Sequence, residues 1–173
     1  MTYPVAFTVN GRAAQVEADP MARLSDVLRL QLGLTGVKVG CEAGDCGACT
    51  ILIDGAQICA CMIPVAQAES RWIETVEGLA SDPVMAALQS SFHHHGAAQC
   101  GICTPGMLMA AAELLRREPQ PGEQAVKDAL GGVLCRCTGY RQIIDAVKGA
   151  SNPPPPEEPL AGKAVGSSGF PQR

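Results

Sequence analysis

Nine cysteines in 173 residues constrain this chain more than any other feature of its sequence. Eight of them fall into two separate sets of four. The N-terminus has neither a basic segment followed by an apolar run nor a twin-arginine signal, so the reducing cytoplasm is the expected compartment. Four disulfides are not expected there, whereas metal binding by thiolates is. The sequence therefore predicts two metal centres, and the fold must bring four cysteines together at each.

The first set lies in the segment GCEAGDCGACTILIDGAQICAC and has the C-x4-C-x2-C…C spacing of plant-type [2Fe–2S] ferredoxins. Glycines in this loop allow the backbone to wrap closely around a cluster, and inward-pointing amide N–H groups stabilise its negatively charged sulfurs. A zinc site is the alternative, but zinc sites usually pair two short cysteine knuckles. The spacing favours iron–sulfur. The expected ligands are Cys41, Cys46, Cys49 and Cys61.

The ninth cysteine, Cys59, lies two residues before Cys61. Residues two apart in a strand share one face of the sheet, so Cys59 could compete with Cys61 as a ligand if one strand held both. A small buried thiol is the interpretation that we favour.

The second set combines a C-x2-C pair in QCGICTPG with a C-x-C pair in LCRCTGY. Cys103 directly precedes a predicted helix start at Thr104-Pro105, and Cys137 directly precedes another at Thr138-Gly139. Free N–H groups and the helix dipole favour negative charge at such positions. The spacing fits no standard zinc knuckle and no thioredoxin motif, so a second [2Fe–2S] cluster is predicted. The expected ligands are Cys100, Cys103, Cys135 and Cys137.

An α+β fold is predicted, in which residues 1–78 form a β-grasp, plant-type ferredoxin domain. Alternating apolar residues predict two hairpins, which turn at Asn10-Gly11 and Asp54-Gly55. Leucines at helical spacing predict one helix between them, with Ser25 as its N-cap and Gly33 as its end. The expected strands are Val5–Val9, Ala13–Glu17, Thr50–Ile53, Gln57–Cys61 and Arg71–Val76.

Residues 79–150 are predicted to form a four-helix, [2Fe–2S]-binding domain. Two of its helices begin with a capping residue followed by proline, at Ser81-Asp82-Pro83 and at Thr104-Pro105. Met107 and Met109 in the second of them are expected to fill the core. Residues 151–173 are rich in Pro, Gly and Ser, and are expected to be either a tail without a core of its own or an arm on a partner chain.

Composition argues against several classes of function. The net charge is −4 and there is no basic patch, so nucleic-acid binding is not expected. No apolar run reaches membrane-spanning length. The His93–His95 run is expected to be a solvated helix end, because three successive helical residues face different directions. No carboxylate pair or nucleophile–base pair is apparent, so we expect no substrate-transforming site on this chain.

With both cysteine sets identified, the chain resembles the small iron–sulfur subunit of the xanthine oxidase family of molybdenum hydroxylases. The resemblance covers about residues 3–150 and rests on VGCEAGDCGACTILIDG, GAAQCGICTPGML and LCRCTGYRQI in this order. It implies an electron-transfer subunit, which passes electrons from molybdopterin through two [2Fe–2S] clusters to FAD or another acceptor. A free two-cluster ferredoxin-type carrier is the alternative.

The resemblance also implies partners and site residues. A large subunit would bind molybdopterin, expected as its cytosine dinucleotide, and a medium subunit would bind FAD, in an assembly expected to be a dimer of heterotrimers. The second cysteine set would hold the cluster proximal to molybdopterin, and the first set the distal cluster. Gln99 and Cys137 correspond to residues that contact the pterin. Glu42 stands where the family often has glycine.

Overall fold

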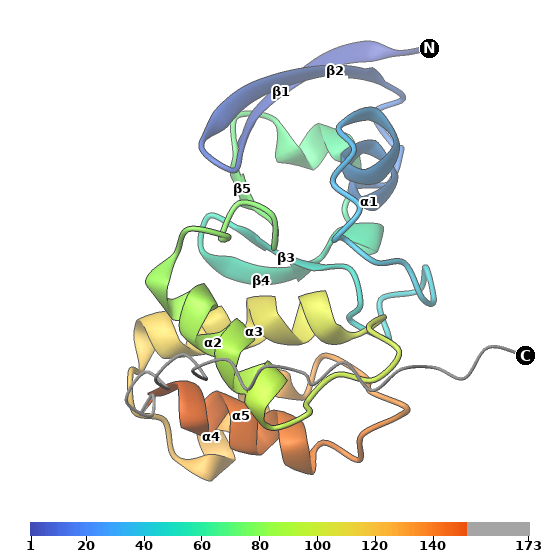
Figure 1. The fold of residues 1–173 in the computed structure, drawn as a ribbon. Coiled ribbons are helices and arrows are strands. Elements are labelled where there is room, and N and C mark those ends of the chain that lie inside the picture. Colours follow the sequence, from blue (N-terminus) through green and yellow to red (C-terminus); the bar gives the residue numbers. More distant parts are fainter. Residues whose placement is uncertain (152–173) are drawn as a thin grey trace, which may run out of the picture.

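The computed structural model describes residues 1–151. The N-terminal half is built on a five-stranded mixed sheet with the strand order β2-β1-β5-β3-β4. β1 pairs in parallel with β5, and the other neighbouring strands pair antiparallel. In Figure 1 the β1–β2 hairpin lies at one end of the molecule and the long helices lie at the other. The strands are β1 (Tyr3–Val9), β2 (Arg12–Ala18), β3 (Thr50–Ile53), β4 (Ala56–Cys59) and β5 (Trp72–Glu74).

Both predicted hairpins are confirmed. Asn10, Gly11, Asp54 and Gly55 all have positive φ angles, between 51° and 82°. A type I′ turn requires positive φ at both central residues, and its twist matches that of the flanking strands. The turn sequences therefore fix the register of each hairpin.

The helix between the hairpins begins differently from the prediction. α1 (Leu24–Asp26) continues into a π-helical turn, η1 (Val27–Gln31), and Gly33 with φ of 70° follows its end. Arg23 is the N-cap and makes no side-chain cap bond. The prediction that Ser25 caps this helix is wrong, because Ser25 lies inside the first turn, where its hydroxyl is buried without a hydrogen-bond partner in the described residues.

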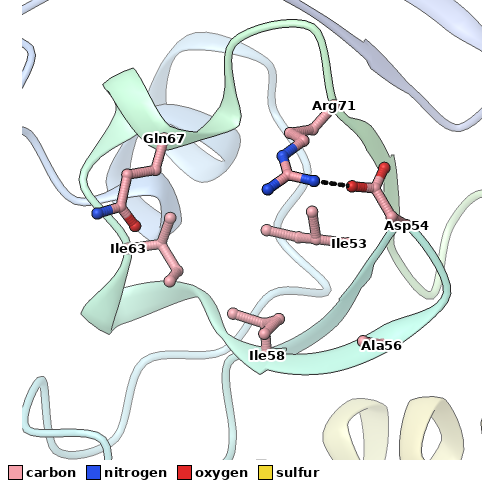
Figure 2. Close-up of a pocket in the computed structure, with 7 residues that line it drawn as sticks. All are labelled: Ile53, Asp54, Ala56, Ile58, Ile63, Gln67 and Arg71. Atoms are coloured by element: carbon pink, nitrogen blue, oxygen red, sulfur yellow. Dashed lines mark hydrogen bonds and ion pairs between the residues drawn. The ribbon is translucent and has the colours of Figure 1, made fainter.

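The second hairpin is shorter than predicted. β4 ends at Cys59, and Cys61 lies in a short 3-10 turn, η2 (Ala60–Met62). The strand expected over Gln57–Cys61 is therefore wrong at its end, and Cys59 and Cys61 do not alternate along one strand. A second 3-10 turn, η3 (Val65–Ala68), leads to β5. Beside this hairpin lies a hollow with an isoleucine floor and an Arg71–Asp54 ion pair at its rim (Figure 2).

Four helices form the C-terminal half of the described residues: α2 (Pro83–His94), α3 (Thr104–Arg117), α4 (Glu123–Leu130) and α5 (Arg141–Ser151). α3 is central, because it contacts α2 and α4 as well as strands β3 and β4. It is correspondingly buried along most of its length, which suits its run of alanines and its leucines. The predicted α+β fold and its four-helix part are confirmed.

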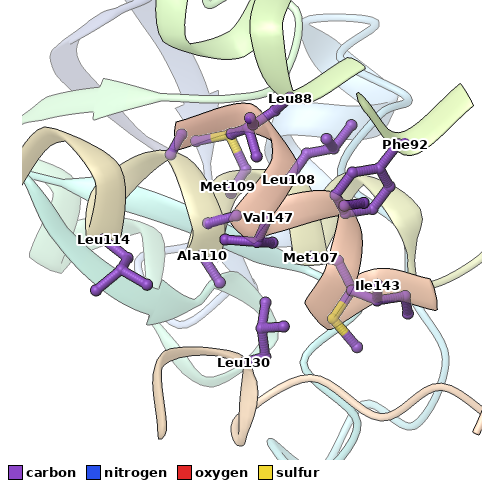
Figure 3. Packing of buried hydrophobic residues seen from close by; sticks show 14 of the residues in the cluster. Leu88, Phe92, Met107, Leu108, Met109, Ala110, Leu114, Leu130, Ile143 and Val147 are labelled. Carbon is purple, nitrogen blue, oxygen red and sulfur yellow. The ribbon is translucent and has the colours of Figure 1, made fainter. Parts of the chain in front are cut away.

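The core of the helical half packs α2, α3 and α5 together (Figure 3). Met107 and Met109 are 0% and 1% exposed, so the prediction that they fill the core is confirmed. Complete burial of an apolar side chain of this size contributes roughly 1.5–3 kcal/mol. This core holds α3 against the sheet, and α3 begins directly after a cysteine of the second set.

The start of the last helix was predicted too early. α5 begins at Arg141, not at Thr138-Gly139. Gly139 and Tyr140 have φ angles of 64° and 69°, and this left-handed conformation cannot continue into a right-handed helix. No described helix is long and apolar enough to span a bilayer. The expected C-terminal tail lies outside the described residues, apart from Ser151, which ends α5.

Candidate metal centres

The first cysteine set lies in the loop between η1 and β3, and in η2. Backbone N–H groups of Ala43 and Cys46 both donate to Cys41 Sγ, at 3.4 Å. The Ala43 amide and then the Cys46 amide lower the pKa of Cys41 to about 7. The amide N–H groups of this loop therefore stabilise the negatively charged form of Cys41, as predicted for the loop as a whole.

The other half of the first set is buried. Cys49 and Cys61 are 2% and 5% exposed, and their side chains contact each other. Burial raises the pKa of Cys49 to about 12. A buried thiolate needs a compensating cation, and a coordinated metal deprotonates a thiol outright.

The loop leaves little space beside its sulfur atoms. A Cβ atom on Gly40 would lie 3.1 Å from Cys46 Sγ, so a side chain there would crowd the sulfur. On another side, Met62 lies against Gly44, where a Cβ would come within 2.9 Å of its side chain. Glycine at position 40 therefore leaves room for the thiols and the cluster that they could hold, and glycine at position 44 lets the loop pass close to Met62.

The second cysteine set joins the α2–α3 loop to the α4–α5 loop. Cys100 and Cys137 are exposed, and their Sγ atoms lie 3.5 Å apart. Cys103 is 5% exposed and contacts Cys135, and burial raises the pKa of Cys103 to about 12. Cys103 directly precedes α3, as predicted, and is its N-cap. The cap expected at Thr104 is wrong, because Thr104 lies inside the first turn with its hydroxyl buried and without a hydrogen-bond partner in the described residues.

Cys135 is surrounded by hydrogen-bond donors. Burial acts to raise its pKa, but hydrogen bonds from the Thr138 hydroxyl and from the amides of Cys137 and Thr138 outweigh burial and lower the pKa to about 7. Thr138 Oγ1 lies 3.1 Å from Cys135 Sγ. The prediction that a second helix N-terminus supplies these donors is wrong, because the turn before α5 supplies them instead.

The thiols are arranged in pairs. Each set contains two contacting pairs, Cys41–Cys46 with Cys49–Cys61, and Cys100–Cys137 with Cys103–Cys135. Two pairs suit a [2Fe–2S] cluster, in which four thiolates are shared between two irons. Within residues 1–151, no group of three or more His, Cys, Asp or Glu side chains is arranged to hold a single ion. Together with the amide donors and the glycine at position 40, the donor sets fit two such clusters.

Cys59 lies next to the first set. Its thiol donates to the Gly44 carbonyl oxygen at 3.7 Å and is half-buried, and burial raises its pKa. Its side chain also contacts Cys49. Cys59 lies close to the first set because β4 ends at this residue, and not because Cys59 and Cys61 share one strand.

The two ligand loops touch, which sequence reasoning did not predict. The Leu134 N–H donates to the carbonyl oxygen of Cys46 at 2.9 Å. A Cβ on Gly47 would lie 2.0 Å from the carbonyl oxygen of Gly132, and a Cβ on Gly106 would lie 2.5 Å from that of Gly47. The only sequence signal was glycine at these positions, which cannot reveal a partner so far along the chain.

Gln99 is exposed and directly precedes Cys100 of the second set. In the His93–His95 run, His93 and His94 are exposed in the last turn of α2, as expected of a solvated helix end, whereas the C-cap residue His95 is partly buried.

Comparison with known proteins gives two family matches. Residues 7–78 match the family described as "2Fe-2S iron-sulfur cluster binding domain", and residues 75–148 match the family described as "[2Fe-2S] binding domain". Both matched segments contain one complete cysteine set.

Relatives and solved structures agree with these matches. The chain is 52% identical over 139 residues to the nicotine 6-hydroxylase small subunit of Paenarthrobacter nicotinovorans, covering 80% of this chain and 84% of the relative. It is 43% identical over 144 residues to the nicotinate dehydrogenase small FeS subunit of Eubacterium barkeri, covering 83% of this chain and 92% of the relative. Quinoline 2-oxidoreductase from Pseudomonas putida 86 superposes with a TM-score of 0.82 at 46% identity, over 87% of this chain and 94% of that one.

Proposed function

The chain belongs to the iron–sulfur small subunits of the xanthine oxidase family of molybdenum hydroxylases, and from this we propose that it transfers electrons through two [2Fe–2S] clusters within a multi-subunit oxidoreductase. When bound, the clusters supply reversible one-electron chemistry. The chain's own residues hold them, stabilise their negative charge and limit access of water. The proposed ligands are Cys41, Cys46, Cys49 and Cys61 for the first cluster, and Cys100, Cys103, Cys135 and Cys137 for the second.

The hydrogen bond between Leu134 and Cys46 is the observation that carries this proposal. It joins the backbone of a first-set ligand to the residue that precedes Cys135, a second-set ligand, at 2.9 Å. One hydrogen bond and a few covalent bonds therefore connect the two proposed clusters. Electron transfer weakens steeply with distance, so this contact between the loops favours transfer between them.

Exposure supports an order for the two clusters. Cys100, Cys137 and Gln99 are all exposed, and next to them Ile102 and Leu134 are 47% and 56% exposed. Apolar side chains beside a metal centre are typical of a surface that a partner covers. We place the large molybdopterin subunit there, with its pterin, expected as the cytosine dinucleotide, against Gln99 and Cys137.

The first cluster is then the distal one, and its partner is a medium FAD subunit or another acceptor. A dimer of such heterotrimers is the proposed assembly. Residues 1–78 and 79–150 are proposed as the two cluster-binding domains. The cytoplasm is the proposed compartment, because nine free cysteines suit reducing conditions.

The route through the second cluster is tested in the purified complex with Cys137→Ala. This variant should lose the second cluster and stop flavin reduction by substrate, even with molybdenum bound. Cys59→Ala is the matched control, and it should keep both clusters and the rate of flavin reduction. Flavin reduction at the wild-type rate in Cys137→Ala would contradict the proposed route. Purification of the chain without any molybdenum-binding partner would favour a free two-cluster carrier.

The pterin contact is tested with Gln99→Ala. Loss of this exposed amide should lower pterin content or slow flavin reduction, while both clusters remain. Gln120→Ala, an exposed glutamine in the loop before α4, is the control and should change neither. Unchanged pterin content and turnover in Gln99→Ala would count against the contact.

A further inference from the structure

A charged pair lies beside the first cysteine set. The Arg23 guanidinium Nη1 hydrogen-bonds to Glu42 Oε2, and Glu42 directly follows the proposed ligand Cys41. Glu42 has a φ angle of 56°, in the left-handed region that glycine adopts more easily. The carboxylate is therefore held in a strained loop position, where it faces an arginine from another segment.

The backbone of Arg23 is fixed next to the other end of the set. Arg23 forms an isolated antiparallel bridge with Pro64, and the Leu24 N–H donates to the Ile63 carbonyl oxygen at 2.8 Å. These residues directly follow η2, which carries Cys61, and α1 packs against η2. Arg23 therefore spans the first set, with its backbone near Cys61 and its side chain near Cys41.

The charges around Arg23 agree with this placement. The hydrogen bond to Glu42 is the largest influence that raises the pKa of Arg23, and the charge of Glu42 adds to it. Both side chains of the pair are partly exposed, at 42% and 55%, so solvent and salt weaken their field. Both charges still act on the first cluster site, because no other domain lies between them and its cysteines.

One-electron reduction of the first cluster adds one negative charge among its four thiolates. A nearby cation stabilises the reduced form and raises the reduction potential, whereas a nearby anion lowers it. We propose that Arg23 and Glu42 set the reduction potential of the first cluster, with Arg23 raising it and Glu42 lowering it. This inference rests on the proposed cluster at Cys41, Cys46, Cys49 and Cys61.

The test is a potentiometric titration of the cluster-loaded full chain, followed by electron paramagnetic resonance. The signal that survives in Cys137→Ala identifies the first cluster. Arg23→Gln should lower its potential, so that a smaller fraction is reduced at a fixed potential. Glu42→Gln should raise the potential, because the guanidinium is then no longer neutralised. The double variant should return close to wild type, and Arg23→Lys should keep most of the effect of the cation.

A matched control lies in the same half of the protein. Arg71 pairs with Asp54 at 2.5 Å and is similarly exposed (Figure 2). Asp54 is five residues along the chain from Cys49, which is roughly 16 Å in extended backbone. Arg71→Gln should therefore leave the potential of the first cluster unchanged. The shifts from Arg23→Gln and Glu42→Gln should also shrink as salt is raised.

Opposite shifts of the first cluster, with the second unmoved, would support the inference. Two shifts of the same sign, or no shift while both clusters titrate normally, would overturn it and leave the proposed function intact. If Arg23→Gln fails to assemble the cluster, the upward shift expected of Glu42→Gln still decides the sign, and a downward shift or none would overturn the inference. A wild-type chain without two one-electron signals would overturn the inference and the proposed function together.

Discussion

The hydroxyl of Tyr140 ties the second ligand loop together at the scale of single residues. Its oxygen accepts a hydrogen bond from the Cys135 N–H at 2.9 Å, and it donates to the Val133 carbonyl oxygen at 3.3 Å. The Tyr140 N–H in turn donates to Thr138 Oγ1 at 3.1 Å. One side chain thus fixes the backbone on both sides of Leu134, which contacts the first ligand loop.

Tyr140→Phe should weaken the second site without emptying the core. The Cys135 N–H then loses its acceptor, at a net cost of about 0.5–1.5 kcal/mol. We expect the second cluster to be lost faster on heating, as measured by the decay of its paramagnetic resonance signal. Tyr3→Phe is the control, because Tyr3 is the other tyrosine and is 51% exposed. Equal decay in both variants would show that the hydroxyl does not stabilise the site.

Gly47 is the residue on which the contact between the loops depends. It has a φ of 64°, and a Cβ there would lie 2.0 Å from a backbone oxygen of Gly132. Gly47→Ala should cost about 1–2 kcal/mol for the left-handed conformation and a further 1–3 kcal/mol for crowding. Gly55→Ala is the control, with a φ of 82° and nothing within 4 Å of the added Cβ. On heating, Gly47→Ala should lose the visible colour of its clusters (thermal bleaching) at a clearly lower temperature than Gly55→Ala. Similar bleaching temperatures would contradict the predicted crowding against Gly132.

The proposed ligands are the part of the site that spacing alone predicts, because both iron–sulfur patterns are short and local. Leu134, Tyr140 and Arg23 were not predicted. Leu134 acts through its backbone, and Arg23 acts through a partner 19 residues away. Neither kind of contact leaves a pattern in one sequence.

At the scale of elements, the start of α2 is the clearest connection between the two halves. Asp82 caps α2 by accepting from the N–H groups of Val84 and Met85, and Pro83 follows at the first helical position. Arg116, near the end of α3, bonds to both Asp82 and Glu74 of β5, at 2.7 and 2.9 Å. One carboxylate therefore serves as a helix cap and as part of a bridge from the sheet to two helices.

The Asp82 variants separate these two roles. Asp82→Asn keeps a capping oxygen but loses the ion pair, whereas Asp82→Ala loses both. Loss of the cap alone costs about 0.5–2 kcal/mol. A loss of 1 kcal/mol lowers the Tm of a domain of this size by about 2–4 °C. We expect the temperature of thermal bleaching at pH 7 to fall in the order wild type, Asp82→Asn, Asp82→Ala. Equal temperatures for the two variants would show that the cap contributes nothing.

The same carboxylate predicts a pH dependence. Burial acts to raise the pKa of Asp82, but the hydrogen bonds from Arg116 and from the two amides outweigh it and lower the pKa below 3.8. A lowered pKa stabilises the fold above the unfolded value and loses this contribution as the pH falls through the folded value. The gap in Tm between wild type and Asp82→Asn, followed by circular dichroism because the clusters are acid-labile, should therefore be full at pH 7 and shrink below pH 3.8. A gap that widened towards acid would contradict this sign.

Elements with strong local signals were predicted well. Both hairpins follow from Asn-Gly and Asp-Gly turns, and α2 follows from its cap and proline. Two of the errors fall where tertiary structure overrides local pattern: β4 ends at Cys59, and α5 begins after a left-handed turn at Gly139-Tyr140. Both of these lie beside a proposed cluster ligand along the chain, whereas the wrong cap at Ser25 does not.

At the scale of the whole molecule, the two halves also meet at the loops that carry the two cysteine sets. α3 packs on β3 and β4, and its start carries Cys103. The loop of the first set contacts Gly106 of α3 and Leu134 before Cys135. This arrangement gives the chain one continuous path between two thiolate sets, and it leaves the outer thiols of the second set exposed to a partner.

The central claim is that this chain holds two [2Fe–2S] clusters, and one measurement tests it most directly. The cluster-loaded chain is reduced with dithionite and studied by electron paramagnetic resonance, together with iron and acid-labile sulfide analysis. Two distinct signals of one spin each are predicted, with about four iron and about four sulfide per chain. Cys137→Ala should remove one signal, and Cys41→Ala should remove the other. A single signal, or bound zinc without labile sulfide, would contradict the account.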